Sequence, residues 1–366
     1  MKNSFGSSVC LTLFGESHGP MLGATLDGLA PGLAVDEAFI AHRLDLRRPA
    51  GAVSTARREP DAFQIVSGVF EGKTTGTPLT ILIPNTRQHS RDYAAARALA
   101  RPGHADYTAQ VKYHGHQDYR GGGHFSGRVT AALVAAGAVC LDALARRGIR
   151  IGSHVAECGG VRDRDFSEDL AADLAALNEK VFAVLDEAAG AEMRSAIAAA
   201  AAEGDSVGGV LETAVLGLPA GVGEPWFDSL EGLLAHALFS VPAVKGVEFG
   251  DGFGLARLRG SQANDEFYME GDRVRTRTNR NGGVNGGISN GMPLIFRCAV
   301  KPTPSIYKEQ RTVDLLRGAD AALRIQGRHD PAIVHRARAV ADSVTALVLC
   351  DALALRYGTD WLVNSE

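Results

Sequence analysis

The residues that decide the fold are 129–147, VTAALVAAGAVCLDALARR, in which nearly every side chain is apolar or small. A helix of this length makes about five turns, and Gly148 follows it at the position where glycine commonly ends a helix. Small side chains let neighbouring elements approach closely. The stretch therefore predicts a buried central helix. The segment from Pro331 to Tyr357, which ends before Gly358, predicts a second long helix.

Around these helices, strand-like apolar runs alternate with polar turns. Shorter helices are predicted at Asp36–Arg47 and Pro225–Leu238, and strands at Val9–Phe14, Phe63–Val69, Leu79–Ile83, Val210–Leu218, Gly246–Leu258 and Leu294–Val300. Residues 166–203 are rich in Ala and Glu, which predicts a helical hairpin on the surface with a break near Gly190. No internal repeat or linker-like stretch divides the chain, so residues 1–366 are predicted to form a single domain.

The composition limits the class of protein. With 366 residues and a net charge of -4, the chain can build a substantial core and is not basic overall, so no nucleic-acid partner is expected. No apolar run reaches the roughly 18 residues of a membrane span, and residues 1–6 lack the pattern of an export signal. We therefore expect a cytoplasmic protein with no membrane partner. The five cysteines lack the spacing of metal ligands, so we expect small core residues and no metal site.

Two glycine-flanked motifs carry histidines. Residues 15–19, GESHG, follow the first predicted strand and place Ser17 and His18 on a loop, and residues 101–106, RPGHAD, place His104 on another. Imidazole is the usual proton carrier near neutral pH. A lone loop histidine, however, is more often simply exposed to solvent.

Two further motifs lie at the predicted starts of the long helices. In residues 121–128, GGGHFSGR, a glycine-rich loop leads into the first helix, where Ser126 and Arg128 can meet an anion together with backbone N–H groups. In residues 328–331, RHDP, Asp330 fits a helix cap and also an ionised proton acceptor. Together the motifs predict an anion-binding enzyme that acts on a phosphorylated acid with His and Asp proton carriers.

Two other segments have a composition that needs interpretation. Residues 71–76, EGKTTG, resemble a nucleotide-binding P-loop, but that motif requires a helix after the Lys-Thr pair, and here Pro78 leads into another strand. Nucleotide binding is therefore rejected there. Residues 273–291 are rich in Arg, Asn and Gly and nearly devoid of apolar side chains, which predicts either disorder or an anion-binding loop outside the core.

Taken in chain order, the motifs resemble those of the chorismate synthase family. The matching segments are residues 15–19, 101–106, 118–123, 126–128, 243–246, 286–289, 301–303 and 327–331. The resemblance extends from about residue 5 to residue 357. It implies an α+β fold, a β-α-β sandwich with long central helices, assembled as a homotetramer.

The resemblance also implies an activity. Members of the family convert 5-enolpyruvylshikimate 3-phosphate to chorismate and phosphate by an anti 1,4-elimination, the last common step of the shikimate pathway. The reaction requires reduced FMN (FMNH2) but consumes no net reducing equivalents. No GxGxxG nicotinamide fingerprint follows a strand here. The source of reduced flavin therefore stays open between an external flavin reductase, an intrinsic NADP(H)-dependent activity and another reductant.

Carried over motif by motif, the resemblance implies the site residues. His18 would protonate the departing phosphate, His104 would lie beside the flavin ring, and Asp330 would accept a proton from flavin N5; the sequence leaves open which histidine takes which role. Ser17 and Ser126 would bridge the flavin and these proton carriers. Substrate anions would be held by Arg48, Arg57, Arg128 and Arg328, and the flavin by His124, Phe125, Ser126, Pro242, Ala243, Gly286, Lys301, Pro302, Thr303, Pro304, Ser305 and Arg328.

The chain departs from the family pattern in a few places, and other functions fit the same residues. Loop 50–56 is a residue shorter and lacks one anion-binding Arg, which we expect Arg57 to replace, and Asp342 stands where Glu is typical. One alternative is a flavin-dependent oxidoreductase that transfers hydride to a dissociable acceptor. Another is an anion- or nucleic-acid-binding module built on residues 273–291, against which the acidic net charge counts.

Overall fold

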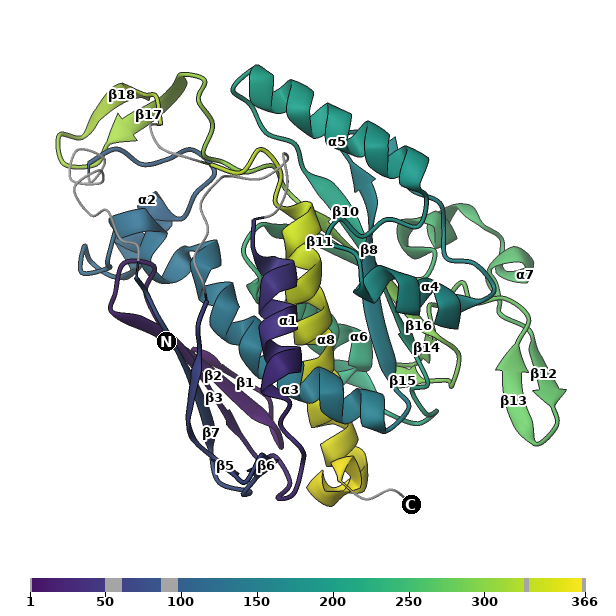
Figure 1. Ribbon diagram of the computed structural model, residues 1–366. Coiled ribbons are helices and arrows are strands. Elements are labelled where there is room, and N and C mark those ends of the chain that lie inside the picture. The colour runs from purple at the N-terminus through teal and green to yellow at the C-terminus, as the bar shows by residue number, and fades with distance from the viewer. Residues whose placement is uncertain (1, 50–60, 87–97, 326–328, 364–366) are drawn as a thin grey trace.

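The computed structural model describes residues 2–49, 61–86, 98–325 and 329–363, which form two antiparallel five-stranded sheets with long helices between them (Figure 1). The first sheet contains, in spatial order, β1 (Ser4–Phe5), β2 (Cys10–Gly15), β3 (Met21–Asp27), β7 (Leu79–Pro84) and β4 (Gln64–Ser67). The second sheet contains β11 (Val244–Phe249), β16 (Leu294–Val300), β10 (Gly209–Leu216), β8 (Arg150–Cys158) and β9 (Val161–Arg162).

Three long helices fill the space between the sheets, namely α1 (Glu37–Arg47), α3 (Thr130–Arg146) and α8 (Val334–Tyr357) (Figure 1). Helix α3 packs against the first sheet, α8 packs against the second, and the two helices pack on each other. A Cβ atom on Gly137 would lie only 2.4 Å from Cβ of Ser343, so the helices approach closely at this point. The predicted α+β sandwich with long central helices is confirmed.

The expectation that no apolar stretch is long enough to span a membrane is wrong for helix α3, which has the composition of a membrane span but the packing of a core helix. Residues 127–146 are long and apolar enough to cross a bilayer, yet 83% of that window is buried inside the protein. The helix is buried because the first sheet, α1 and α8 cover it. Four of the five cysteines, Cys140, Cys158, Cys298 and Cys350, are buried as expected, and Cys10 is partly buried.

Helix starts follow local capping chemistry. Asp36 accepts a hydrogen bond from Phe39 N (3.0 Å) and begins α1, as predicted. Helix α6 (Leu230–Ser240) is capped by Ser229 and begins five residues later than the predicted start at Pro225, because residues 226–228 form a short 3-10 helix, η4, instead. Helix α8 likewise begins at Val334 and not at Pro331.

The segment 166–203 contains two helices, α4 (Leu170–Asn178) and α5 (Glu187–Ala202), beside the second sheet. The predicted break near Gly190 is wrong, because this residue lies inside α5. The chain turns between the helices, and Asp186 caps α5 by accepting a hydrogen bond from Ala188 N (2.8 Å). A Cβ on Gly190 would lie 2.6 Å from Cγ2 of Val184, so glycine here permits close packing.

Residues 273–291 are ordered, so the disorder alternative is wrong. They contain β13 (Arg273–Thr276), which pairs with β12 (Phe267–Glu270), and the short strands β14 (Val284–Asn285) and β15 (Ile288–Ser289). The carboxylate of Asp265 accepts hydrogen bonds from Thr278 Oγ1 (2.6 Å), Arg280 N (2.8 Å) and Asn281 N (2.9 Å). The hydrogen bonds to this buried carboxylate thus hold the segment in place, as packed apolar side chains do elsewhere in the protein.

The remaining elements are short. They are β5 (Val69–Phe70), β6 (Lys73–Thr74), β17 (Gln310–Asp314), β18 (Ala319–Leu323), α2 (Asp106–Lys112), α7 (Gly260–Ala263) and the 3-10 helices η2 (Arg120–Phe125), η3 (Gly127–Val129), η5 (Gly252–Arg257) and η6 (Thr359–Leu362). The Lys-Thr pair lies in β6 and is not followed by a helix, which confirms that this segment is no P-loop. The strand predicted at Gly246–Leu258 ends at Phe249, and η5 replaces its second half.

Candidate active site

Three consecutive glycines form a tight loop immediately before α3. Gly121, Gly122 and Gly123 have φ angles of 58°, 87° and 53°, a region that side chains disfavour. A Cβ on Gly121 would lie 2.2 Å from Cε1 of His18, and one on Gly122 would lie 3.0 Å from Cε1 of His104. Two imidazoles from distant parts of the chain therefore flank one glycine loop, which leaves room for both.

The loop after β2 is fixed to this glycine loop. Ser17 N donates a hydrogen bond to Gly123 O (3.0 Å), and His124 Nδ1 lies 2.8 Å from Gly15 O. Both Ser17 and His18 are buried, with 7% and 3% of their surfaces exposed. For His18, the interpretation as a solvent-exposed loop histidine is therefore wrong.

His104 is oriented by its own motif. Its Nδ1 lies 2.8 Å from Asp106 Oδ1 and 3.0 Å from Nη2 of Arg101, and Arg101 Nε donates to Asp106 Oδ2 (2.7 Å). Burial opposes the charge of Asp106, but hydrogen bonds from Arg101 and His104 outweigh it and lower the pKa of Asp106. The Nδ1 edge of the ring faces Asp106 and Arg101, and the Cε1–Nε2 edge faces the glycine loop.

Arg128 is held in place at the start of η3. Its Nη1 donates to Asp61 Oδ1, and its Nε donates to Asn85 Oδ1 (3.1 Å). The amide nitrogen of Asn85 donates in turn to the backbone oxygens of Glu16 (3.0 Å) and Gly19 (2.9 Å). The guanidinium is thereby linked to the loop that carries His18.

Asp330 belongs to the same polar network and does not cap α8. Its Oδ2 accepts a hydrogen bond from Arg336 Nη1, while Arg336 Nε donates to Arg47 O (2.8 Å) at the end of α1. The cap interpretation is therefore wrong, because Ile333 precedes the first helical residue and no side chain caps this helix. Since Arg47 also pairs with Asp61 (2.8 Å), the network runs continuously from Asp330 to the His18 loop.

The segment expected to bind flavin lies beside the His104 loop. Lys301 Nζ donates to Gly103 O, and Lys301 N donates to Ala243 O (3.0 Å). Ala243 has a φ of 75°, a strained backbone for a residue with a side chain. Among the described residues, no hydrogen-bond partner faces the buried Oγ1 of Thr303.

Some expected site residues are not brought together within one chain. Gly286 lies in the β14–β15 turn at the start of α6, where Gly287 O accepts from Leu230 N (2.8 Å), whereas Ala243 follows the end of that helix. An 11-residue helix is about 16 Å long. Phe125 packs edge-on against Tyr113, with ring centroids 5.9 Å apart. Arg57 and Arg328 lie outside the described residues.

The sequence motifs did not predict three residues that organise the site, namely Asp61, Asn85 and Arg336. Asn85 lies two residues after the predicted strand Leu79–Ile83, and a polar residue just after a strand was the available signal. Arg336 has no such signal, because only the packing of α8 against α1 brings it to Arg47 O.

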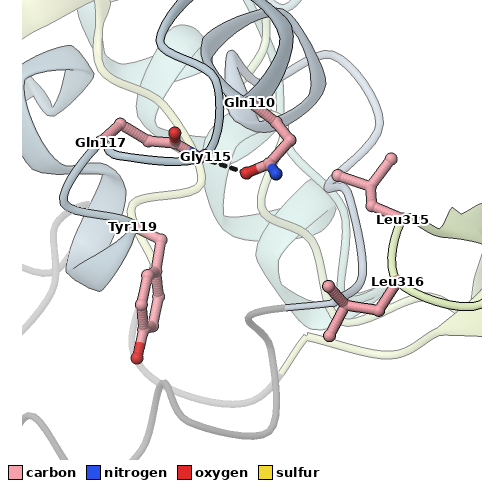
Figure 2. A pocket seen from close by; sticks show the side chains of 6 residues that line it. All are labelled: Gln110, Gly115, Gln117, Tyr119, Leu315 and Leu316. Carbon is pink, nitrogen blue, oxygen red and sulfur yellow. Dashed lines mark hydrogen bonds between the residues drawn. The ribbon is translucent and has the colours of Figure 1, made fainter.

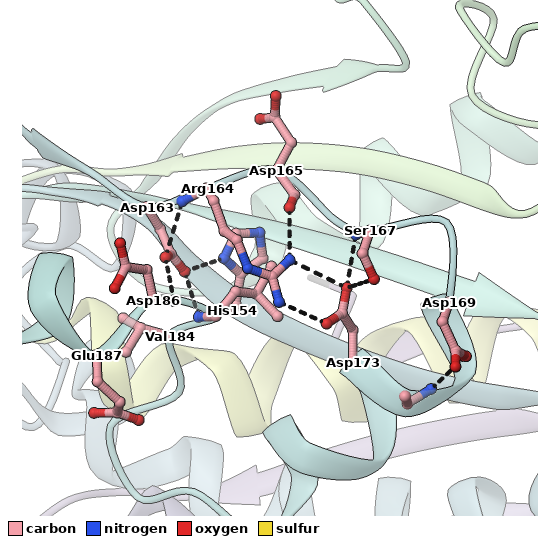
Figure 3. Close-up of polar contacts among 12 residues, drawn as sticks. His154, Asp163, Arg164, Asp165, Ser167, Asp169, Asp173, Val184, Asp186 and Glu187 are labelled. Carbon is pink, nitrogen blue, oxygen red and sulfur yellow. Dashed lines mark hydrogen bonds and ion pairs between the residues drawn. The ribbon is translucent and has the colours of Figure 1, made fainter.

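Two other features lie apart from these proton carriers. Figure 2 shows a small hollow lined by Gln110, Gly115, Gln117, Tyr119, Leu315 and Leu316, in which the two glutamine side chains bond to each other (2.7 Å). Figure 3 shows a polar cluster at the edge of the second sheet, centred on His154, Asp163, Arg164 and Asp173. In the described parts of the chain, no group of three or more His, Cys, Asp and Glu side chains is placed to hold a metal ion.

Fold and site together define a class of protein. This is an α+β sandwich enzyme in which two imidazoles flank one glycine loop near the start of a buried helix. A hydrogen-bonded network of guanidinium groups links the His18 loop to the carboxylate of Asp330. Such groups suit the departure of an anionic group coupled to proton transfer.

Comparison with known proteins identifies the family. The family model of chorismate synthase matches residues 9–354. The chain is 47% identical over 355 residues to the chorismate synthase of Aeropyrum pernix, covering 97% of this chain and 93% of the relative. It is also 47% identical over 364 residues to that of Dehalococcoides mccartyi, covering 98% of each. A crystal structure of chorismate synthase superposes with a TM-score of 0.77 at 32% identity, covering 97% of this chain and 94% of that one.

The chain belongs to the chorismate synthase family. Enzymes of this family are lyases that carry out the chorismate-forming step of the shikimate pathway, and membership removes the non-enzymatic alternative.

Proposed function

We propose that this protein converts 5-enolpyruvylshikimate 3-phosphate to chorismate and phosphate by an anti 1,4-elimination that requires reduced FMN. The observation that carries the proposal is the position of His18 and His104 on either side of Gly121 and Gly122. In this reaction a ring C–H bond and the C–O bond to phosphate break, the C–H electron pair enters the new diene, and phosphate departs with the other pair. An acid at the leaving oxygen and an acceptor for the lost proton are both needed.

The residues beside His104 fit a flavin phosphate. Lys301 supplies an ammonium group. Thr303 supplies a hydroxyl whose buried oxygen has no hydrogen-bond partner in the described chain, and the strained backbone of Ala243 lies next to this segment. Ser305 is also buried there. When bound, reduced FMN supplies an electron-rich ring to the elimination and is not consumed.

Different side chains of the protein carry out the separate proton transfers. His18 protonates the departing phosphate oxygen, because its loop is linked through Asn85 to Arg128, which would bind an anionic group of the substrate. His104 presents Nδ1 to Asp106 and Nε2 to the glycine loop. Asp330, which pairs with Arg336, is the final acceptor of the proton that is lost. Arg48 and Arg128 bind the anionic groups of the substrate.

We propose further that the enzyme works as a cytoplasmic homotetramer supplied with reduced flavin by an external flavin reductase or another reductant. Large exposed aromatic side chains support association of copies, since Trp226, Phe227 and Phe253 have 85%, 95% and 81% of their surfaces exposed. Aromatic side chains left in solvent to this extent are typical of contact surfaces.

The test is anaerobic turnover. Purified protein is mixed with photochemically reduced FMN and 5-enolpyruvylshikimate 3-phosphate, and the diene absorbance of chorismate is followed. A lyase forms many equivalents of chorismate per flavin, whereas an oxidoreductase consumes one reductant for each product. Product formation that stops after one equivalent of flavin would contradict the proposal and favour the oxidoreductase alternative.

A further inference from the structure

Asp61 lies at the centre of the arginine cluster but belongs to no motif of the site. Its Oδ1 accepts from Arg128 Nη1, and its Oδ2 accepts from Arg47 Nη2 (2.8 Å). The same Oδ2 lies 3.7 Å from Nε of Arg48, whose Nη1 pairs with Asp45. Three guanidinium groups from α1 and from the start of α3 are therefore gathered around one carboxylate.

The Asp61 carboxylate is buried beneath the arginine side chains, on the side away from solvent. None of the Asp61 side chain is exposed, whereas 10% of the Arg128 side chain and 29% of the Arg48 side chain are. The backbone of Asp61 has a φ of 40°, an uncommon conformation that aims the side chain inward. A ligand that meets the exposed parts of Arg48 and Arg128 would not touch Asp61.

Two electrostatic effects oppose each other at this position. Removing the negative charge would make the cluster more positive, which attracts an anion. It would also leave neighbouring guanidinium groups to repel each other, because Arg336 and Arg128 both act against the charge on Arg47. Recognition of phosphate or carboxylate by arginine depends on the planar fork being held in one orientation. We therefore expect the loss of arginine orientation to weaken anion binding more than the added positive charge strengthens it.

We propose that Asp61 is a positioning residue for substrate binding: it holds Arg128 by a direct hydrogen bond, and Arg48 by attraction at longer range, in the orientation that binds the anionic groups of the substrate. The inference rests on the proposed function, in which these two arginines bind substrate. Asp61 contacts neither the substrate nor the flavin, and its influence passes through the guanidinium groups. Asn85 fixes Arg128 from a second side.

The experiment measures substrate binding apart from turnover. Binding of 5-enolpyruvylshikimate 3-phosphate to Asp61→Asn is followed by titration calorimetry with oxidised FMN present, and kcat is measured at saturating substrate with reduced FMN. We expect substrate affinity to fall about tenfold or more, with kcat within about threefold of the parent enzyme. Unchanged or tighter substrate binding by the folded variant would overturn the inference, since added positive charge alone predicts the tighter result.

Asp173→Asn is the matched control. Asp173 is also buried and accepts from a guanidinium, that of Arg164, but it lies at the edge of the second sheet (Figure 3). This substitution should weaken the fold to a similar degree and leave substrate affinity unchanged. If Asp61→Asn does not fold, Asp61→Glu keeps the charge and moves the carboxylate by one methylene. A folded Asp61→Glu protein with parental substrate affinity would then overturn the inference.

The two proposals fail in different ways. If the parent protein makes no chorismate, the proposed function is wrong. If the parent makes chorismate while Asp61→Asn binds substrate equally well, only the positioning role is wrong.

Discussion

At the scale of single residues, the partner of Asp330 decides its role. The sequence offered a helix cap or a proton acceptor, and the carboxylate pairs with Arg336 at the edge of the arginine network instead of capping α8. Because asparagine keeps the shape but cannot accept a proton, Asp330→Asn should lower kcat by roughly 10²-fold or more. Substrate affinity should change little. Single-turnover kinetics with reduced FMN measure the first quantity, and calorimetry measures the second.

A variant that turns over at a near-normal rate would make Asp330 only a structural partner of Arg336. Arg336 itself serves as the comparison, since it reaches both Asp330 and Arg47 O. Arg336→Lys keeps the charge and should retain more turnover than Asp330→Asn does.

At the scale of elements, the contact between α3 and α8 has no room for an extra atom. A Cβ on Gly137 would meet Cβ, Cα and the backbone oxygen of Ser343 at 2.4, 2.8 and 2.9 Å. Alanine favours a helix by up to about 1 kcal/mol over glycine, but overpacking a tight core costs about 1–3 kcal/mol. We therefore expect Gly137→Ala to lower the melting temperature.

Gly260→Ala is the control, because no atom of the described residues lies within 4 Å of the Cβ that it would add. A thermal unfolding scan compares both variants with the parent. If Gly137→Ala is as stable as the parent, the helices can separate at this crossing, and the close approach of α3 and α8 is not needed for the fold.

Helices and strands that are determined by residues next to each other in the sequence could be predicted from it. Helix α1 begins at its Asp36 cap as predicted, and α3 has its expected extent within a residue at each end. The start of α8 was placed too early, because Asp-Pro resembles a helix start while the carboxylate is bound elsewhere. The sequence left open whether residues 273–291 are ordered, because their order depends on Asp265, which precedes that segment.

At the scale of the whole molecule, a buried histidine ties the outer helices to the second sheet. His154 on β8 lies 2.7 Å from Asp163 (Figure 3). It also lies 3.0 Å from Glu212 on β10, and Asp163 accepts from Leu185 N (2.6 Å) next to α5. Burial lowers the pKa of His154, but the hydrogen bonds to these two carboxylates outweigh it, so its pKa is raised above 6.5.

The raised pKa makes part of the stability depend on pH. The stabilisation is fully present below the unfolded pKa near 6.5 and is lost as pH rises through the folded value. Each pH unit between the two values corresponds to about 1.4 kcal/mol. The difference in melting temperature between the parent and His154→Asn should therefore be largest near pH 6 and shrink towards pH 9. A difference that stays constant over this range would show that His154 is neutral in the folded protein.

The sequence by itself determined the elements and the inventory of chemical groups. Apolar periodicity, caps and glycines act over a few residues, so they identified the central helices, most strands and the loops that carry His18, His104 and Arg128. Only the tertiary structure decided which groups meet. The packing of two sheets around α3 and α8 brings the two histidines to one glycine loop, Asp330 to Arg336, and Asp61 behind the arginines. Such meetings depend on contacts between residues far apart in the chain, which no local pattern records.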